Sequence, residues 1–221
     1  MTKASRPRTA ADRKHRLQRI LDALDLRYPG VTCALRHHDA WQLLVATILS
    51  AQCTDERVNM VTPDLFRRYP TIHDLAAAPV QEVAAVVRST GFVNNKAKNI
   101  VGAAQTILRD FGGQVPGTLD QLLTVPGAAR KTANVVLGTA FGIPSGVVVD
   151  THVARISNRL DLTRHSDPVK IERDLIAILP ESRWIQFSHQ VIHFGRELCQ
   201  ARKPRCAQCP IAAECYAKDK Q

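Results

Sequence analysis

Four cysteines near the end of the chain are spaced as metal ligands. They follow a C-x6-C-x2-C-x5-C pattern within seventeen residues and are Cys199, Cys206, Cys209 and Cys215. Four thiolates can close a tetrahedral Zn²⁺ site or hold a 4Fe–4S cluster, with one thiolate on each iron. Zinc sites more often contain two C-x2-C pairs separated by a longer finger, and only one such pair occurs here. The spacing therefore predicts a metal site and favours iron–sulfur over zinc.

A compact helical hairpin is expected in the middle of the chain. One helix is predicted over residues 118–124 and a second over 130–141, with Pro126–Gly127 forming a tight turn between them. The backbone N–H groups at the start of the second helix could bind a phosphate. Such a hairpin can hold a DNA backbone without reading bases, although most helical hairpins are purely structural. The hairpin alone leaves both interpretations open.

Lys131 and Asp150 could carry covalent chemistry. Lys131 is expected in the first turn of the second hairpin helix, where the helix dipole and the neighbouring Arg130 both disfavour the charged ammonium form. A neutral amine is a nucleophile for carbon and can form a Schiff base. The simpler alternative is a lysine that contacts a phosphate. Asp150 follows the apolar run Val147–Val149, and its simplest role is to cap the helix that begins at Thr151.

The elements that must position these residues are helices. A central helix is expected where apolar residues occur on every side; they are Trp41, Leu43, Leu44, Val45, Ala46, Ile48 and Leu49. An apolar stripe over residues 97–111 predicts another helix, which should end at Gly112–Gly113. Further helices are expected over residues 12–28, 55–69, 81–89, 118–124, 130–141, 150–160, 168–179 and 182–198. The one strand-like stretch, Val147–Val149, is too short for a sheet, so the predicted fold class is all-α.

Two segments interrupt this helical pattern. Phe141–Gly146 contains Gly142, Pro144 and Gly146 and is the best candidate hinge in the second half of the chain. Residues after about 198 have little apolar periodicity but contain four cysteines. A metal must therefore replace a hydrophobic core in that region.

Composition narrows the class of protein. The 221 residues are 45% apolar, which argues against disorder, and no apolar run reaches the length of a membrane span. Lys and Arg outnumber Asp and Glu by 30 to 20, and the resulting charge of +10 suits a nucleic acid partner. The N-terminal MTKASRPRTAADRKHR lacks the apolar region of a signal peptide and is expected to be a solvated basic arm. Six cysteines without a secretory signal indicate thiols or metal ligands in a reducing, cytoplasmic compartment.

Several segments together resemble the endonuclease III family of DNA glycosylases. They are VPGAARKTANVVLGTAFGIPSGVVVDTH, GRELCQARKPRCAQCP followed by Cys215, LSAQCTDERVN near residue 50 and GFVNNKAKNI near residue 91. The similarity covers roughly residues 15–217. It implies a helix–hairpin–helix DNA glycosylase fold, with a six-helix domain over residues 33–143 that contains the hairpin (about 118–141). Residues 1–32 with 144–221 would form an iron–sulfur domain from the N-terminal helix and the C-terminal helices and loop.

The resemblance implies specific catalytic roles. Lys131 is similar to the family's nucleophile, which attacks the sugar C1′ and expels the damaged base. Asp150 would help to deprotonate the lysine and would stabilise positive charge on the sugar. The ligands of a 4Fe–4S cluster, which displaces the zinc alternative, would be Cys199, Cys206, Cys209 and Cys215.

The resemblance also implies a set of DNA-contacting residues: Gln52, Phe92, Gly127, Ala129, Arg202, Lys203 and Arg205. Gln52 would fill the gap left by a flipped nucleotide, and Phe92, where the family often has leucine, would be an apolar wedge at the opposite strand. The three basic residues would form a phosphate-binding loop, unless they are an ordinary solvated charge run. Ala129 departs from the family pattern Pro-Gly-x-Gly. We expect its methyl group to crowd a phosphate, and positive φ is costly for alanine, so the affinity of the hairpin for DNA should be affected.

The function implied is that of a base-excision glycosylase with abasic-site lyase activity on oxidised pyrimidines. The base must leave the stack before a side chain can reach C1′. The expected partner is double-stranded DNA with damaged bases or abasic sites; no membrane and no dissociable cofactor or Mg²⁺ is expected, and the chain should act as a monomer. One alternative is a monofunctional glycosylase, such as the related adenine-excising enzymes, which lack the nucleophilic lysine. Another is a non-catalytic DNA-binding module with a metal-stabilised loop.

Overall fold

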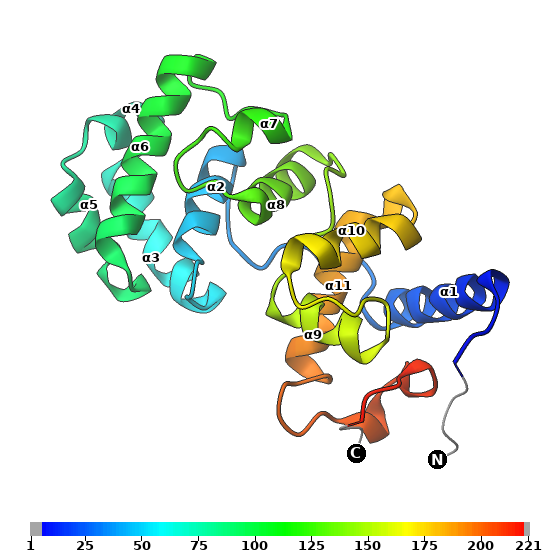
Figure 1. The fold of residues 1–221 in the computed structure, drawn as a ribbon. Coiled ribbons are helices and arrows are strands. Elements are labelled where there is room, and N and C mark those ends of the chain that lie inside the picture. Colours follow the sequence, from blue (N-terminus) through cyan, green and yellow to red (C-terminus); the bar gives the residue numbers. More distant parts are fainter. Residues whose placement is uncertain (1–5, 219–221) are drawn as a thin grey trace. The chain divides into compact units, whose positions relative to one another are not determined.

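The computed structural model describes residues 6–218 and is built from helices (Figure 1). Within that range no residue belongs to a strand, so the all-α prediction is confirmed. The chain divides into two compact units. One unit is Cys33–Ser145, and the other combines the segment up to Thr32 with the segment from Gly146 onward. The boundary falls within the segment Phe141–Gly146 that the glycines and proline single out as a hinge.

The unit Cys33–Ser145 is a helical bundle around α2 (Ala40–Leu49). Residues 43–49 of α2 are all buried, as expected for a helix that is apolar on every side. α2 packs against α3, α6 and α8, and the remaining helices lie around these (Figure 1). Their bounds are α3 (Asp55–Arg68), α4 (Ile72–Ala77), α5 (Val80–Val86), η1 (Arg88–Thr90), α6 (Val93–Phe111), α7 (Leu119–Leu122) and α8 (Arg130–Phe141).

Two details of this unit differ from the sequence-based expectation. α4 has only six residues, too few for a visible apolar period, and it is held by a capping box between Thr71 and Asp74. The helix expected over residues 81–89 ends at Val86, and a 3-10 turn, η1, follows it. The long helix α6 ends as predicted, because Gly112 adopts the left-handed conformation and Gly113 N–H donates to Ile107 O at 3.0 Å.

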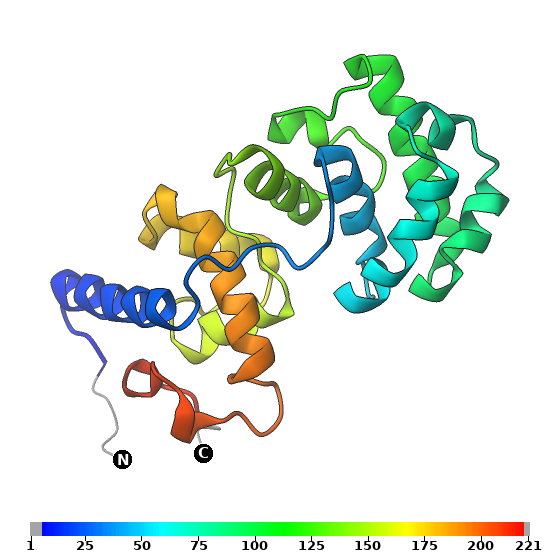
Figure 2. The same cartoon turned by 180° about the vertical axis from the view of Figure 1, so that it is seen from behind.

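The second unit is centred on α11 (Trp184–Glu197). This helix packs against α1 (Ala10–Arg27) and α9 (Thr151–Arg159) (Figure 2). Its Phe187 and Phe194 are fully buried. α11 and α9 cross closely at Gly195, where a Cβ atom would lie 2.7 Å from His152 Nδ1. The unit also contains α10 (Pro168–Ile178) and the 3-10 turns η2 (Glu181–Arg183), η3 (Cys206–Gln208) and η4 (Ala212–Glu214).

The N-terminal basic segment leads directly into α1, and residues 8–15 of it are exposed to solvent. Residues 1–5 lie outside the described residues, but α1 already begins at Ala10, with a capping box between Thr9 and Asp12. Leu17, Ile20 and Leu24 bury one face of this helix in the core. Among residues 6–218, no helix is both long and apolar enough to cross a membrane.

Candidate active site

The hairpin consists of α7, a short turn and α8. Gly127 in the turn has φ +80°, a conformation that side chains other than glycine's rarely adopt. A Cβ atom here would also lie 3.0 Å from Asn99 Cβ and 3.1 Å from Ile48 Cδ1. Gly127 is thus required twice, for the turn and for the close approach of the hairpin to α2 and α6.

Ala129 stands immediately before α8 and fits its position without strain. Its φ is −65° and its ψ is 166°, an ordinary extended conformation. The expected backbone penalty at this alanine is therefore wrong, because the position does not need a positive φ. The side chain is exposed, and no side chain caps the helix here. Whether the methyl group crowds a phosphate stays a prediction about the complex with DNA.

Lys131 lies in the first turn of α8 with its side chain exposed. The helix is held by Ala133, Val136 and Leu137, which are fully buried on its other side. α8 packs on α2 through this face. The lysine therefore projects from a helix that is held in place by its buried face. It lies beside the backbone N–H groups at the start of α8, which can bind an anion.

Asp150 is the N-cap of α9 and belongs to the other unit. Its Oδ1 accepts hydrogen bonds from the backbone N–H groups of His152 and Val153, both at 2.8 Å. The preceding Val147 and Val149 are buried in the core of that unit, which fixes the start of the helix. Because both bonds reach the same oxygen, the cap leaves Oδ2 unused. Asp150 is only partly buried, so that oxygen is within reach of a ligand.

The four C-terminal cysteines line one cavity. Cys199, Cys206, Cys209 and Cys215 share it with apolar groups that include Phe194, Leu198 and Ile211. All four are free thiols. Within residues 6–218, no three His, Cys, Asp or Glu side chains are arranged to hold a single metal ion.

The surroundings of these sulfurs fit a group that binds thiolates. Burial raises the pKa of the Cys209 thiol to about 11 and also raises that of Cys199. Arg159 donates to Cys199 Sγ at 3.3 Å. Together with Arg155 it offsets part of the rise in the pKa of that thiol. Four sulfur donors around an apolar cavity with cations beside it match the donor set of an iron–sulfur cluster.

The predicted basic loop connects the first two of these cysteines. Arg202, Lys203 and Arg205 are exposed, and the loop closes where Arg205 N–H donates to Leu198 O at 2.9 Å. Lys203 has φ +53°, in the left-handed region. The three charged residues therefore lie on a closed turn with their side chains in solvent, and phosphate binding by them stays a prediction.

Gln52 and Phe92 stand on two separate loops of the unit Cys33–Ser145. Gln52 lies between α2 and α3, and Phe92 immediately precedes α6. Both are exposed, Phe92 by 64%, and both have positive φ, 52° and 49°. Such residues are uncommon and cluster at functional sites. Of the four non-glycine residues with positive φ in the described chain, three are in the predicted DNA-contact set, the fourth being Asp161.

Comparison with known proteins identifies the family. Residues 45–181 match the family described as HhH-GPD superfamily base excision DNA repair protein. Endonuclease III of Synechocystis sp. is 55% identical, over 94% of this chain and 95% of its own length. Endonuclease III of Bacillus subtilis is 43% identical, over 91% of this chain and 92% of that protein. The chain belongs to the endonuclease III family.

Solved structures show the same relationship. A structure described as a trapped endonuclease III–DNA covalent intermediate matches with a TM-score of 0.87 and 41% identity, over 92% of this chain and 95% of that chain. A non-covalent endonuclease III–DNA complex matches with the same TM-score and 42% identity, over the same shares of both chains. The resemblance found in the sequence segments and the helix–hairpin–helix fold are confirmed. As a member of the endonuclease III family, the chain is a base-excision DNA-repair enzyme.

One buried lysine of the unit Cys33–Ser145 was not predicted from the sequence. Lys96 is only 4% exposed, and its Nζ donates to Thr90 O at 2.6 Å, while its backbone N–H donates to Phe92 O at 3.1 Å. Burial lowers the pKa of this ammonium. Lys96 thus braces the turn that presents Phe92. The signal was present, because Lys96 falls in helical register with the buried Ile100.

Proposed function

We propose that the chain is a DNA N-glycosylase with abasic-site lyase activity that removes oxidised pyrimidines from double-stranded DNA, with Lys131 as the nucleophile. The observation that carries this proposal is an exposed lysine in the first turn of α8, directly after the Gly127 turn, in a chain of the endonuclease III family. The solved structure described as a trapped covalent intermediate between endonuclease III and DNA supports covalent chemistry in this family.

The proposed reaction begins at the sugar carbon that carries the base. The Lys131 amine forms a bond to C1′, the glycosidic bond breaks, and the base leaves with its electron pair and takes up a proton. The lysine nitrogen then loses a proton, its lone pair forms the C=N bond, and the C1′–O4′ bond breaks with O4′ taking up a proton. The ring-opened sugar is now joined to Lys131 as a protonated imine. Loss of a proton from C2′ and departure of the 3′ phosphate cut the strand, and water finally hydrolyses the imine to release the enzyme.

Asp150 would supply negative charge to this reaction. Its Oδ1 is occupied by the cap of α9, so the chemistry falls to Oδ2. A fixed carboxylate stabilises the positive charge that develops on the sugar as the base departs. Because the cap holds the carboxylate in place, it needs no rearrangement during the reaction.

The remaining predicted residues would bind and open the duplex. Gln52 and Phe92 would enter the base stack, Gln52 in the gap left by the flipped nucleotide and Phe92 at the opposite strand. The hairpin at Gly127 and Ala129 and the basic loop at Arg202, Lys203 and Arg205 would bind phosphates. The net charge of +10 supports such binding.

The four cysteines would hold a 4Fe–4S cluster, one sulfur on each iron. When bound, the cluster would cross-link the C-terminal segment and hold the basic loop in its turn. This role is structural, and no proton or bond of the reaction passes through it. The two units of the chain would then correspond to a six-helix domain and an iron–sulfur domain.

Borohydride trapping tests the proposal. Borohydride reduces an imine to a stable amine, so the wild-type protein should become covalently joined to duplexes that carry an oxidised pyrimidine. Lys131→Gln should lose this adduct while DNA affinity falls by less than about tenfold, since one cation among many phosphate contacts is removed. The matched control is Lys98→Gln, an exposed lysine on α6.

Two results would contradict the proposal. An adduct at wild-type yield in Lys131→Gln would place the nucleophile elsewhere. Base release by the wild-type protein without any adduct, on every duplex of a panel of different oxidised bases, would favour a monofunctional glycosylase.

A further inference from the structure

Arg16 on α1 is a charged residue at an apolar position. It lies one helical turn before the buried Ile20 and two before Leu24, and it is itself only 5% exposed. A buried guanidinium is costly unless its donors are paired. The partners of the Arg16 guanidinium therefore show which segments this buried charge joins.

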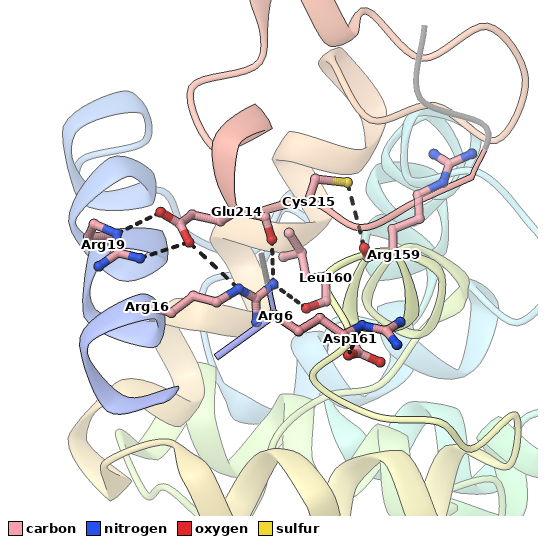
Figure 3. Close-up of polar contacts among 8 residues, drawn as sticks. All are labelled: Arg6, Arg16, Arg19, Arg159, Leu160, Asp161, Glu214 and Cys215. Atoms are coloured by element: carbon pink, nitrogen blue, oxygen red, sulfur yellow. Dashed lines mark hydrogen bonds and ion pairs between the residues drawn. The ribbon is translucent and has the colours of Figure 1, made fainter. Parts of the chain in front are cut away.

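Those partners lie on two segments that are distant from Arg16 in sequence (Figure 3). Arg16 Nη2 donates to the backbone carbonyls of Leu160, at the end of α9, and of Glu214, in η4. Arg16 Nε lies 3.6 Å from Glu214 Oε2. The guanidinium also stacks over the Tyr216 ring, 4.5 Å from its centroid. One side chain thus joins α1, α9 and η4.

Glu214 is clamped from a second side by Arg19. Arg19 Nε donates to Oε1 at 2.6 Å and Nη2 donates to Oε2 at 3.0 Å, a bidentate pair. The Glu214 side chain is 14% exposed, so this carboxylate is largely removed from water and faces two arginines. Figure 3 shows both arginines reaching Glu214 from α1.

Cys215 lies between the two clamped residues. Glu214 precedes it and Tyr216 follows it, and Tyr216 N–H donates to Arg159 O at 3.2 Å. The Cys215 thiol donates to the same carbonyl at 3.6 Å. Residues 209–217, which surround Cys215, contain only the three-residue turn η4 and one buried apolar side chain, Ile211. Its position is therefore set by contacts from outside.

We propose that Arg16 and Glu214 form a latch by which α1 positions Cys215 at the cysteine cavity, so that retention of a thiolate-bound cluster depends on the N-terminal helix. The inference rests on the proposed ligation by the four cysteines. Arg16 does not line the cavity, but its partner Leu160 does, and so does Cys215, which lies between the Arg16 partners Glu214 and Tyr216. Arg16 is thus a positioning residue that acts through Cys215.

Iron release from the purified holoprotein tests this latch. Arg16→Met keeps an unbranched stem at the buried position and removes every donor. It should release iron to a ferrous chelator, under anaerobic conditions, on the order of tenfold faster than wild type, because hydrogen bonds to a charged group are lost. Glu214→Gln should accelerate release less, since the carbonyl contacts of Arg16 remain. Combined, the two changes should be less than additive. Arg13→Met, exposed on the same helix, is the matched control and should behave as wild type.

Two further variants separate positioning from simple destabilisation of α1. Arg16→Lys should recover part of the retention, because an ammonium can still donate to the two carbonyls. Leu17→Ala removes a buried side chain of the same helix without touching η4. If Leu17→Ala accelerates iron release as much as Arg16→Met at a matched loss of Tm, Arg16 merely packs and the latch is overturned.

The outcomes also distinguish this inference from the proposed ligation. Wild-type protein that holds no iron after anaerobic purification would overturn the ligation and the latch together. Wild-type protein that holds about four irons, with unchanged release in Arg16→Met, would overturn the latch alone.

Discussion

Asp150 illustrates how one residue can serve both the fold and the proposed chemistry. Its two hydrogen bonds to the start of α9 use a single carboxylate oxygen. A cap needs only a side-chain acceptor, which an amide also provides, whereas stabilising a cation needs the negative charge. At the scale of the residue, replacing the carboxylate by an amide therefore separates the two roles. Lys131 has no comparable structural duty, since α8 is held by its buried face.

Asp150→Asn should keep the fold and DNA affinity but slow base release by about 10²–10⁴-fold, the usual contribution of a charged catalytic group. Single-turnover excision and urea unfolding would measure the two effects. Asp167→Asn is the matched control, because Asp167 caps α10 through a 2.9 Å bond from Lys170 N–H and has no proposed chemistry. Similar excision rates in the two variants would reduce Asp150 to a cap.

The connections between helices carry most of the predicted DNA contacts. The turn at Gly127, the loop at Gln52, the turn at Phe92 and the loop at Lys203 each contain a residue with positive φ. Holding a non-glycine residue there costs on the order of 1–3 kcal/mol, which the surrounding structure must offset. At the scale of the element, rigid helices thus support short, strained connections that present side chains outward.

Gly127→Ala and Ala129→Gly should differ in their effect on stability, although both lie in the hairpin. Gly127→Ala introduces a methyl group at positive φ and 3.0 Å from Asn99 Cβ, so it should destabilise the protein by about 2–4 kcal/mol. Ala129→Gly should leave stability within about 1 kcal/mol, because φ there is already negative. Urea denaturation measures both; comparable losses would show that the two positions are equivalent. If the Ala129 methyl group crowds a phosphate, Ala129→Gly should also tighten DNA binding.

Gln52→Ala and Phe92→Ala should impair excision from a paired duplex more than cleavage at a preformed abasic site. An abasic site needs less unstacking, so residues that enter the stack matter less there. The two rates are measured on duplexes of identical sequence. Met60→Ala on α3, also exposed at 61%, serves as the control. Equal losses on both substrates would indicate that Gln52 and Phe92 only pack.

On the scale of the whole molecule, each unit has its own hydrophobic core and each carries part of the proposed machinery. Lys131, Gln52 and Phe92 belong to the unit Cys33–Ser145, whereas Asp150 and the four cysteines belong to the other. The second unit is assembled from both ends of the chain. It therefore depends on contacts that join α1 to the C-terminal helices, such as the pair between Asp25 and Arg183.

Asp25 makes one of these contacts sensitive to pH. Arg183 Nη2 donates to its Oδ1 at 2.6 Å and Gln190 Nε2 donates at 2.8 Å, and these bonds lower the pKa of the carboxyl group. A lowered pKa stabilises the fold above the unfolded value of 3.8, and this stability is lost as the pH falls through the folded value.

The stability difference between wild type and Asp25→Asn should therefore shrink as the pH falls below about 4. It should stay below about 1 kcal/mol at neutral pH, because the Asp25 side chain is 43% exposed. Urea unfolding across this range measures it. Arg183→Met should weaken the same dependence, because only the Gln190 bond to Asp25 then remains, and an undiminished dependence there would assign the effect to another group.

Local sequence patterns predicted most of the helices and the candidate site residues. Helical periods predicted the central helix at residues 40–49 and the long helix that ends at Gly112, because burial of one helix face is decided by residues three and four apart. The short helix α4 and the turn η1 were missed, since elements of three to six residues are too short for such a period. The cysteine spacing and the family segments located the candidate site residues for the same local reason.

Other features were decided only by the tertiary structure. The negative φ of Ala129, the burial of Lys96 and the reach of Arg16 to Glu214, 198 residues away in sequence, follow from which segments pack together. Apolar patterning can show that a face is buried, but not which segment covers it. A lysine or arginine in an apolar register becomes favourable only when that segment brings a carbonyl or carboxylate to its charge, and this pairing is a property of the assembled fold.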